Sequence, residues 1–251
     1  MEHSTTLPPE IDQGLSEFLD AARLAFGDGL VSAVLFGSAA EGRLRAVSDV
    51  NLILILKHFD RSRVDLIREQ FRIAHTAMRL DVMFLLEVEI EAVMDAFAVK
   101  FSDVLSRRRI LFGSDPFANF TIPPEAVRRR TMQVLLNLML RMRERYALVS
   151  LREEQLLHVV AEVTGPLRSC AFSVLACEGK HTPSPREAFA LILTEQDAAK
   201  STDVIRLIDT ARREGTLPPG SAGPLLFSLM ELAKFMYERI SMTAGTECDH
   251  G

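Results

Sequence analysis

Hydrophobic and polar residues follow two different periods along the first half of the chain. Some stretches carry apolar residues at the spacing of an amphipathic helix, and others are short, nearly continuous apolar runs of strand length. The run that begins at Asp49 has no polar position after Asn51, so we expect a strand that is covered on both faces. The expected strands are residues 30–36, 49–56, 80–86 and 109–112, and the expected helices are residues 10–26, a helix from Asp60 or Ser62 to about Met78, and residues 87–96.

The second half of the chain carries only helical patterns. It begins after Pro123-Pro124, and the apolar stripe of its first helix is interrupted by Thr131. We expect Gly165-Pro166 to interrupt the next helix, because proline lacks the N–H that a helix interior needs. The expected helices are residues 125–148, 151–167, 167–178, 185–193, 203–212 and 222–242.

These patterns predict an α+β protein with two domains. We expect residues 1–122 to form a small mixed β-sheet with flanking helices, and residues 123–245 to form an all-α helical bundle with short loops. Residues 246–251 are expected to be a flexible tail. The long helix at 125–148 is compatible with a homodimer, and a bundle core explains its apolar stripe equally well.

Composition narrows the range of partners and compartments. The chain has 251 residues, of which 48% are hydrophobic, and a net charge of −5, which gives no overall attraction to nucleic acid or to an anionic membrane. Its longest apolar run, Ala188–Leu193, is too short to span a bilayer, and its first ten residues lack the features of a secretory signal. The three cysteines match no zinc pattern, and we expect Cys170 and Cys177 to be buried. A cytoplasmic protein with no membrane and no nucleic-acid partner is therefore expected.

The candidate chemistry lies near the ends of the first three expected strands. Gly37-Ser38 follows the first strand, and such a turn offers backbone N–H groups and a hydroxyl to phosphate. Asp49 and Asn51 stand two residues apart on the second strand, so their side chains point to one face, and Asp81 stands on the third strand. Because Mg²⁺ is usually held by one or two carboxylates together with phosphate oxygens, this pattern indicates a site for metal and nucleotide.

Three short segments carry a resemblance to a known superfamily. Leu35–Ser38, Ser48–Leu52 and Leu80–Val82 resemble the motifs of the nucleotidyltransferases of DNA polymerase β type. Within that superfamily they look most like bacterial nucleotidyltransferase-domain proteins, which include the aminoglycoside adenylyltransferases and the minimal nucleotidyltransferases. The resemblance covers about residues 12–117, and residues 110–113 are similar to the strand and glycine that often close that domain.

The resemblance implies a role for each residue of the motifs. Gly37 and Ser38 would meet the β and γ phosphates of a nucleoside triphosphate, and Asp49 would ligate Mg²⁺. Asp81 would be the third acid, which helps to hold the catalytic metal or activates the acceptor hydroxyl. Asn51 stands where the second metal-binding acid normally stands. An amide oxygen can still coordinate a metal, but the unit charge is lost.

Two functions remain open on this basis. The first is an enzyme that uses Mg²⁺ to transfer a nucleoside monophosphate, AMP from ATP, to a hydroxyl of a small molecule or a protein. The second is a weakened or inactive nucleotidyltransferase fold that binds nucleotide or a partner. Since changes even beyond the direct ligands of a metal cost roughly 10–100-fold in affinity or activity, Asn51 should cost at least that much.

Other polar residues are weaker candidates. Asp103 is an alternative third acid, and Arg141 and Arg145 share a helix face that we expect to be solvated. His158 lies in an apolar stretch and is expected to be a core histidine. Arg152 and His158 also have the kind of spacing found in helical ribonuclease-like toxins that pair with minimal nucleotidyltransferases, which is a weak signal because both residue types are common.

Overall fold

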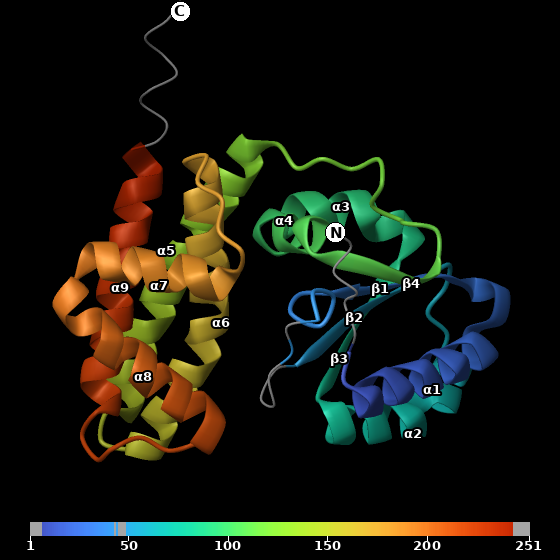
Figure 1. The fold of residues 1–251 in the computed structure, drawn as a ribbon, viewed down its shortest axis with the longest axis horizontal. Coiled ribbons are helices and arrows are strands. Elements are labelled where there is room, and N and C mark those ends of the chain that lie inside the picture. The colour runs from blue at the N-terminus through green and yellow to red at the C-terminus, as the bar shows by residue number, and fades with distance from the viewer. Residues whose placement is uncertain (1–6, 43, 45–48, 243–251) are drawn as a thin grey trace, which may run out of the picture. The chain divides into compact units, whose positions relative to one another are not determined.

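The computed structural model describes residues 7–42, 44 and 49–242, and these divide into two compact units (Figure 1). The first unit comprises Met1–Phe97 with Phe101–Ile122, and the second comprises Ala98–Lys100 with Pro123–Gly251. Ser48 of the second motif and the tail predicted at 246–251 lie outside the described residues.

The first unit is built on a four-stranded mixed sheet, as the sequence predicted. The strand order is β3-β2-β1-β4, in which β1 pairs antiparallel with both β2 and β4, and β2 pairs parallel with β3. A parallel pair needs a crossover connection, and helix α2 supplies it. The elements are α1 (Pro9–Phe26), η1 (Gly27–Gly29), β1 (Leu30–Phe36), β2 (Val50–Leu56), α2 (Arg61–Met78), β3 (Leu80–Leu86), η2 (Glu87–Glu89), α3 (Ile90–Ala96), α4 (Ala98–Ser106) and β4 (Arg108–Gly113).

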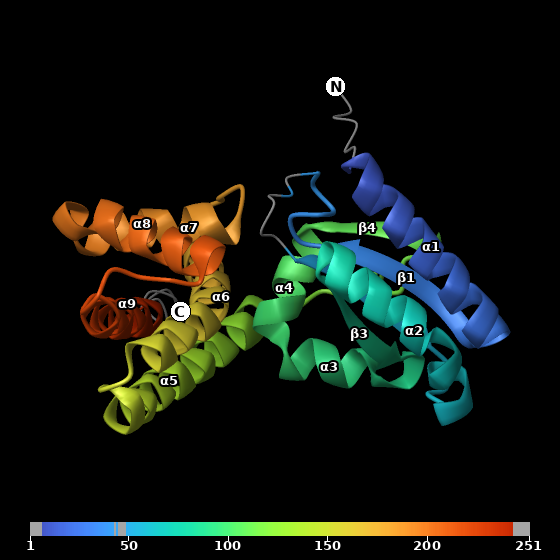
Figure 2. The ribbon, with the colours of Figure 1, turned by 90° about the horizontal axis from the view of Figure 1, so that it is seen from below.

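Both faces of this sheet are covered by helices (Figures 1 and 2). Alternate residues of each strand point to opposite faces, so each strand contributes to two separate cores. Leu52 and Leu54 of β2 pack in one core with residues of α1 and α2, and Ile53 and Ile55 pack in the other with residues of α3 and α4. The double coverage explains why the sequence of β2 is apolar almost throughout.

Three elements of the first unit differ from the prediction. Strand β2 begins at Val50, so Asp49 directly precedes the strand. The expected helix at 87–96 is a 3₁₀ turn, η2, followed by α3. Helix α4 was not predicted, because its nine residues are too few for a clear periodic pattern, yet its Phe101 is fully buried and contacts Phe117 with ring centroids 5.6 Å apart.

The second unit is a helical bundle, as predicted. Its helices share one continuous core of buried aliphatic residues, and Thr131 sits in that core because its hydroxyl donates to the carbonyl of Val127 at 2.7 Å. No strand occurs among its described residues. The helices are α5 (Pro124–Val149), α6 (Glu153–Cys177), α7 (Pro185–Gln196), α8 (Ala198–Glu214) and α9 (Ala222–Met242).

The expected break at Gly165-Pro166 is wrong, because α6 runs unbroken from Glu153 to Cys177 with Pro166 inside it. Leu167 and Val163 are buried on either side of the proline, so core packing holds the helix together despite the missing N–H. Helix α6 is also long and apolar enough to cross a membrane, but 56% of its 18-residue apolar stretch is buried inside the protein, as in a core helix.

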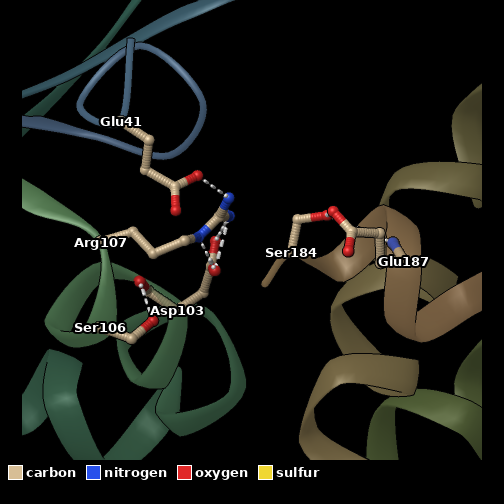
Figure 3. Close-up of polar contacts among 6 residues, drawn as sticks. All are labelled: Glu41, Asp103, Ser106, Arg107, Ser184 and Glu187. Atoms are coloured by element: carbon tan, nitrogen blue, oxygen red, sulfur yellow. Dashed lines mark hydrogen bonds and ion pairs between the residues drawn. The ribbon is translucent and has the colours of Figure 1, made fainter. Parts of the chain in front are cut away.

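Side-chain caps fix the starts of the next two helices. The Ser184 hydroxyl accepts the N–H of Glu187 at 3.3 Å at the start of α7 (Figure 3). The Asp197 carboxylate accepts the N–H groups of Ala199 and Lys200 at 3.1 and 3.2 Å at the start of α8. This cap explains why α8 begins at Ala198 and not at Asp203, where the apolar period had suggested.

Candidate functional site

The turn after β1 is held by the backbone of Gly37. Gly37 has φ of 74°, a left-handed value that suits glycine, and a Cβ there would meet only Nδ2 of Asn51, at 3.8 Å. Its N–H donates to the carbonyl of Arg107 at 3.0 Å, and its carbonyl accepts the N–H of Ala40 at 3.1 Å. Because the Gly37 N–H is already engaged, a phosphate bound at this turn would take its donors from Ser38 onward.

The pairing register brings the predicted acids together where β1 ends and where β2 and β3 begin, which we call the edge of the sheet. Phe36, the last residue of β1, pairs with Asn51 of β2, and Asn51 pairs with Asp81 of β3. Asp49 stands two residues before Asn51 and directly before β2. The end of β1 and the starts of β2 and β3 therefore meet where the Gly37 turn leaves the sheet.

Asp49 is paired with an arginine that the sequence analysis did not single out. Its Oδ1 accepts Nε of Arg79 at 2.7 Å, and both side chains are partly exposed. The backbone carbonyl of Asp49 accepts Nδ2 of Asn51 at 3.3 Å. The backbone of Arg79 is held as well, because its carbonyl accepts the N–H of Val50 at 3.3 Å.

Asp49 and Asp81 line one cavity of about 400 Å³, together with Arg79 and His75. Nδ1 of His75 lies 2.9 Å from the carbonyl oxygen of Leu80, and since a carbonyl only accepts, this nitrogen carries the proton. Neither Arg79 nor His75 was indicated by the motifs. The one available signal was position: Arg79 directly follows a helix, at the place where glycine or asparagine is usual.

The donor set fits one divalent ion better than two. Asp49 and Asp81 offer two carboxylates, and the Asn51 side chain offers a neutral oxygen, a combination that Mg²⁺ accepts when phosphate oxygens complete its coordination. No group of three or more His, Cys, Asp or Glu side chains placed to hold a metal occurs in the part of the chain that the structure describes. Arg79 moreover already neutralises Asp49.

Arg107 links the turn after β1 to helix α4, and Figure 3 shows its contacts with Glu41 and Asp103. Its guanidinium donates two hydrogen bonds of 2.7 Å to Asp103 of α4 and one of 3.1 Å to Glu41, while its carbonyl accepts from Gly37. Burial lowers the pKa of Arg107, and the hydrogen bonds and charges of the two carboxylates outweigh this, so that its pKa is raised and the side chain stays charged. The Asp103 carboxylate is therefore engaged in a structural ion pair, away from the cavity that Asp81 lines.

A larger cavity, of about 750 Å³, lies within the helical unit at the turn between α5 and α6. Arg145, Arg152 and His158 line it together with exposed leucines. The expectation that His158 is a core histidine is wrong: it is exposed, because it lies on the side of α6 opposite the buried Leu157 and Val160. The cavity near Asp49 is smaller, but it brings together two of the acids that the sequence motifs predict, Asp49 and Asp81.

The remaining helical candidates have structural surroundings. Arg141 lies on a solvated face, as expected, and pairs with Glu162 at 2.9 Å with both side chains more than half exposed. Cys170 is fully buried, as expected, whereas Cys177 is only half-buried. These positions leave the edge of the sheet as the better candidate site.

Two known proteins are similar to this chain, one over a short segment and one in its fold. No family model matches the chain. A segment of 51 residues, 20% of this chain, is 45% identical to "Putative protein adenylyltransferase MJ1305" of Methanocaldococcus jannaschii and spans 35% of that protein's length. The crystal structure of spectinomycin adenyltransferase AAD(9) from Enterococcus faecialis, with ATP and spectinomycin, is similar over 92% of this chain and 99% of that one, with a TM-score of 0.61 and 13% identity.

The structural likeness extends over both units of the chain, so it includes the helical bundle as well as the sheet. At 13% identity it speaks for the fold, and the curated relative matches only a short segment. The chain therefore has an α+β nucleotidyltransferase fold, and both comparisons fit the nucleotidyltransferase superfamily that its sequence motifs resemble.

Proposed function

We propose that the protein transfers a nucleoside monophosphate, AMP from ATP, to a hydroxyl group of an acceptor. The observation that carries the proposal is that Asp49 and Asp81 line one cavity at the edge of the sheet where the Gly37-Ser38 turn lies. The solved structure of similar fold, a spectinomycin adenyltransferase, contains ATP and spectinomycin. A small molecule or a protein remains the candidate acceptor.

This reaction requires the chain to bind the phosphates, to hold a metal ion and to accept the proton of the acceptor hydroxyl. Ser38 donates its hydroxyl to a phosphate oxygen, and the turn after Gly37 adds backbone N–H groups. Asp49 and Asp81, with the Asn51 amide oxygen, would hold one Mg²⁺ ion, whose chemistry there is to neutralise charge on the phosphate oxygens. The acceptor oxygen forms a bond to the α phosphorus, the bond to pyrophosphate breaks, and Asp81 takes the hydroxyl proton.

A second function is favoured by a different observation. Asn51 removes one acid from the expected set, and Asp49 is already neutralised by Arg79. A protein that binds nucleotide but does not transfer it would retain the turn and the cavity with this charge balance. The two functions share a nucleotide site and differ only in turnover.

Nucleotide binding is tested by thermal unfolding with and without Mg-ATP. We expect Mg-ATP to raise the melting temperature and Asp49→Ala to abolish the rise, because the ligand stabilises only the folded state. Asp20→Ala is the matched control, since Asp20 is an exposed acid of the same unit. The proposal fails if no nucleoside triphosphate raises the melting temperature of the wild type.

Turnover separates the two functions. Pyrophosphate release is measured over a panel of hydroxyl acceptors for the wild type and for Asn51→Asp. Release by the wild type supports transfer, and release only after Asn51→Asp identifies a binding protein with a weakened site. If the wild type turns over and Asn51→Asp slows it, the asparagine belongs to a specialised mechanism.

A further inference from the structure

Arg79 occupies a backbone conformation that arginine rarely adopts. It is the cap residue at the end of α2, with φ of 54° and ψ of 42°, and no other described residue except glycine has a positive φ. The Cβ of an L-residue is crowded in this conformation, and helices that end this way usually carry glycine. A strained residue that persists at such a position points to a role for its side chain.

The side chain of Arg79 is directed to the candidate site. Its Nε lies 2.7 Å from Oδ1 of Asp49, and it lines the cavity together with Asp81 and His75. The Arg79 side chain is 55% exposed and that of Asp49 is 39% exposed. An ion pair with this exposure is weak, so either partner can exchange it for another ligand.

The charges of the site are those expected if a protein side chain supplies part of the positive charge. Three carboxylates with two divalent ions carry a net charge of +1. The two carboxylates of Asp49 and Asp81, with the neutral Asn51, reach the same net charge with one divalent ion and the guanidinium of Arg79. The planar donors of a guanidinium match two oxygens of a phosphate, and arginine cannot lose its proton under physiological conditions.

We propose that Arg79 binds the triphosphate of the nucleotide and supplies the positive charge that a second divalent ion would otherwise provide. On nucleotide binding, Asp49 exchanges the Arg79 guanidinium for one metal ion, and the guanidinium turns to the phosphate oxygens. The inference rests on the nucleotide binding proposed above. It implies one metal ion per bound nucleotide and a measurable affinity for nucleotide without any metal.

Calorimetric titration with a non-hydrolysable ATP analogue tests this directly. We expect the wild type to bind the analogue in EDTA and more tightly with Mg²⁺, and Arg79→Gln to weaken metal-free binding by about tenfold or more, the worth of a charged hydrogen bond to phosphate. Arg79→Lys, which keeps the charge without the fork, should fall between the two. Arg79→Gly distinguishes the effect of the lost guanidinium from that of backbone strain, because glycine has no donor but adopts the left-handed conformation readily.

Arg72→Gln is the matched control. Arg72 is on α2, the helix that Arg79 caps, and its exposed side chain is paired with Glu69, so its loss should leave the affinity unchanged. Electron paramagnetic resonance with Mn²⁺ supplies the second readout. We expect one Mn²⁺ per bound analogue in the wild type and two in the Asn51→Asp/Arg79→Gln variant, in which an acid has replaced the fixed cation.

The outcomes separate this inference from the proposed function. Suppose that the wild type binds the analogue with Mg²⁺, and that Arg79→Gln binds it as tightly as the wild type does, both in EDTA and in Mg²⁺. The role of Arg79 is then overturned while the nucleotide site stands. Two Mn²⁺ per analogue in the wild type overturn it as well. If the wild type binds no analogue under either condition, the proposed function fails, and this inference fails with it.

Discussion

Replacing Arg107 by methionine should destabilise the first unit far more than the loss of an ordinary surface ion pair. The Arg107 side chain is 11% exposed, and its partners Asp103 and Glu41 are 14% and 19% exposed. Removing the guanidinium takes the Arg107 cation away from two nearly buried carboxylates. Breaking a buried pair in this way typically costs 3–5 kcal/mol, and we expect about 3 kcal/mol here because a little of each group reaches water.

The assay must report on the first unit alone. The chain has no tryptophan, and its two tyrosines, Tyr146 and Tyr237, belong to the helical unit, so intrinsic fluorescence does not follow the sheet. Hydrogen exchange measured by mass spectrometry across a urea series resolves peptides from β1 and β2. Arg72→Met is the control, because its pair with Glu69 is more than half exposed on both sides and should contribute little to stability.

A second variant tests the cause of the loss. If unpaired carboxylates are responsible, adding Asp103→Asn to Arg107→Met should recover part of the stability, since one buried charge is removed. The reasoning is refuted if Arg107→Met costs no more than Arg72→Met. It is also refuted if the double variant is less stable than Arg107→Met by as much as Asp103→Asn alone destabilises the wild type.

Three further predictions concern the helical unit. Pro166→Ala should stabilise this unit by about 1–3 kcal/mol, because Pro166 is exposed and alanine restores a helical N–H. Urea unfolding followed by tyrosine fluorescence measures the change, and a loss of stability would show that the proline shapes the packing of α6. Burial raises the pKa of Cys170 to about 12, so alkylation at pH 8 should leave this thiol unmodified in the folded protein and modify it only after unfolding. Mass spectrometry detects the modification, and labelling of the folded state would contradict the burial of Cys170. Burial raises the pKa of Glu178, but hydrogen bonds from Arg239 and Lys180 outweigh this and hold its pKa below the ordinary value for a glutamate. Its ion pairs therefore add stability that is fully present above the ordinary glutamate pKa and is lost as the pH falls through the lower, folded pKa. Glu178→Gln should flatten this acid limb of stability against pH, and an unchanged slope would show that other carboxylates set it.

Much of the fold could be predicted because its determinants are local. The apolar runs of β1, β2 and β3 are of strand length, and the Pro123-Pro124 pair marks the change to helical patterns. The failures arise where tertiary packing decides. Pro166 has the local signature of a helix break, yet the core on both sides holds α6 together, and α4 is too short to show a period but is fixed by the burial of Phe101.

The candidate site was predictable only in part, for a similar reason. Gly37 follows the end of β1, Asp49 directly precedes β2 and Asp81 lies at the start of β3, so the order of strands along the chain already suggested that they would meet. Arg79 and His75 reach the same cavity through the end of α2, and no sequence pattern shows that a residue has a left-handed backbone. Asp103 had been an alternative third acid, and only the structure shows that Arg107 engages it.

The most direct test of the central claim is calorimetric titration of the Mg²⁺ complex of a non-hydrolysable ATP analogue into the wild type, Asp49→Asn and Asp81→Asn. Both replacements keep the shape of the side chain and remove its charge. The account predicts saturable binding with one site per chain in the wild type and weakened binding in both variants. Equal binding by all three proteins, or no binding by the wild type, would contradict a nucleotide site at Asp49 and Asp81.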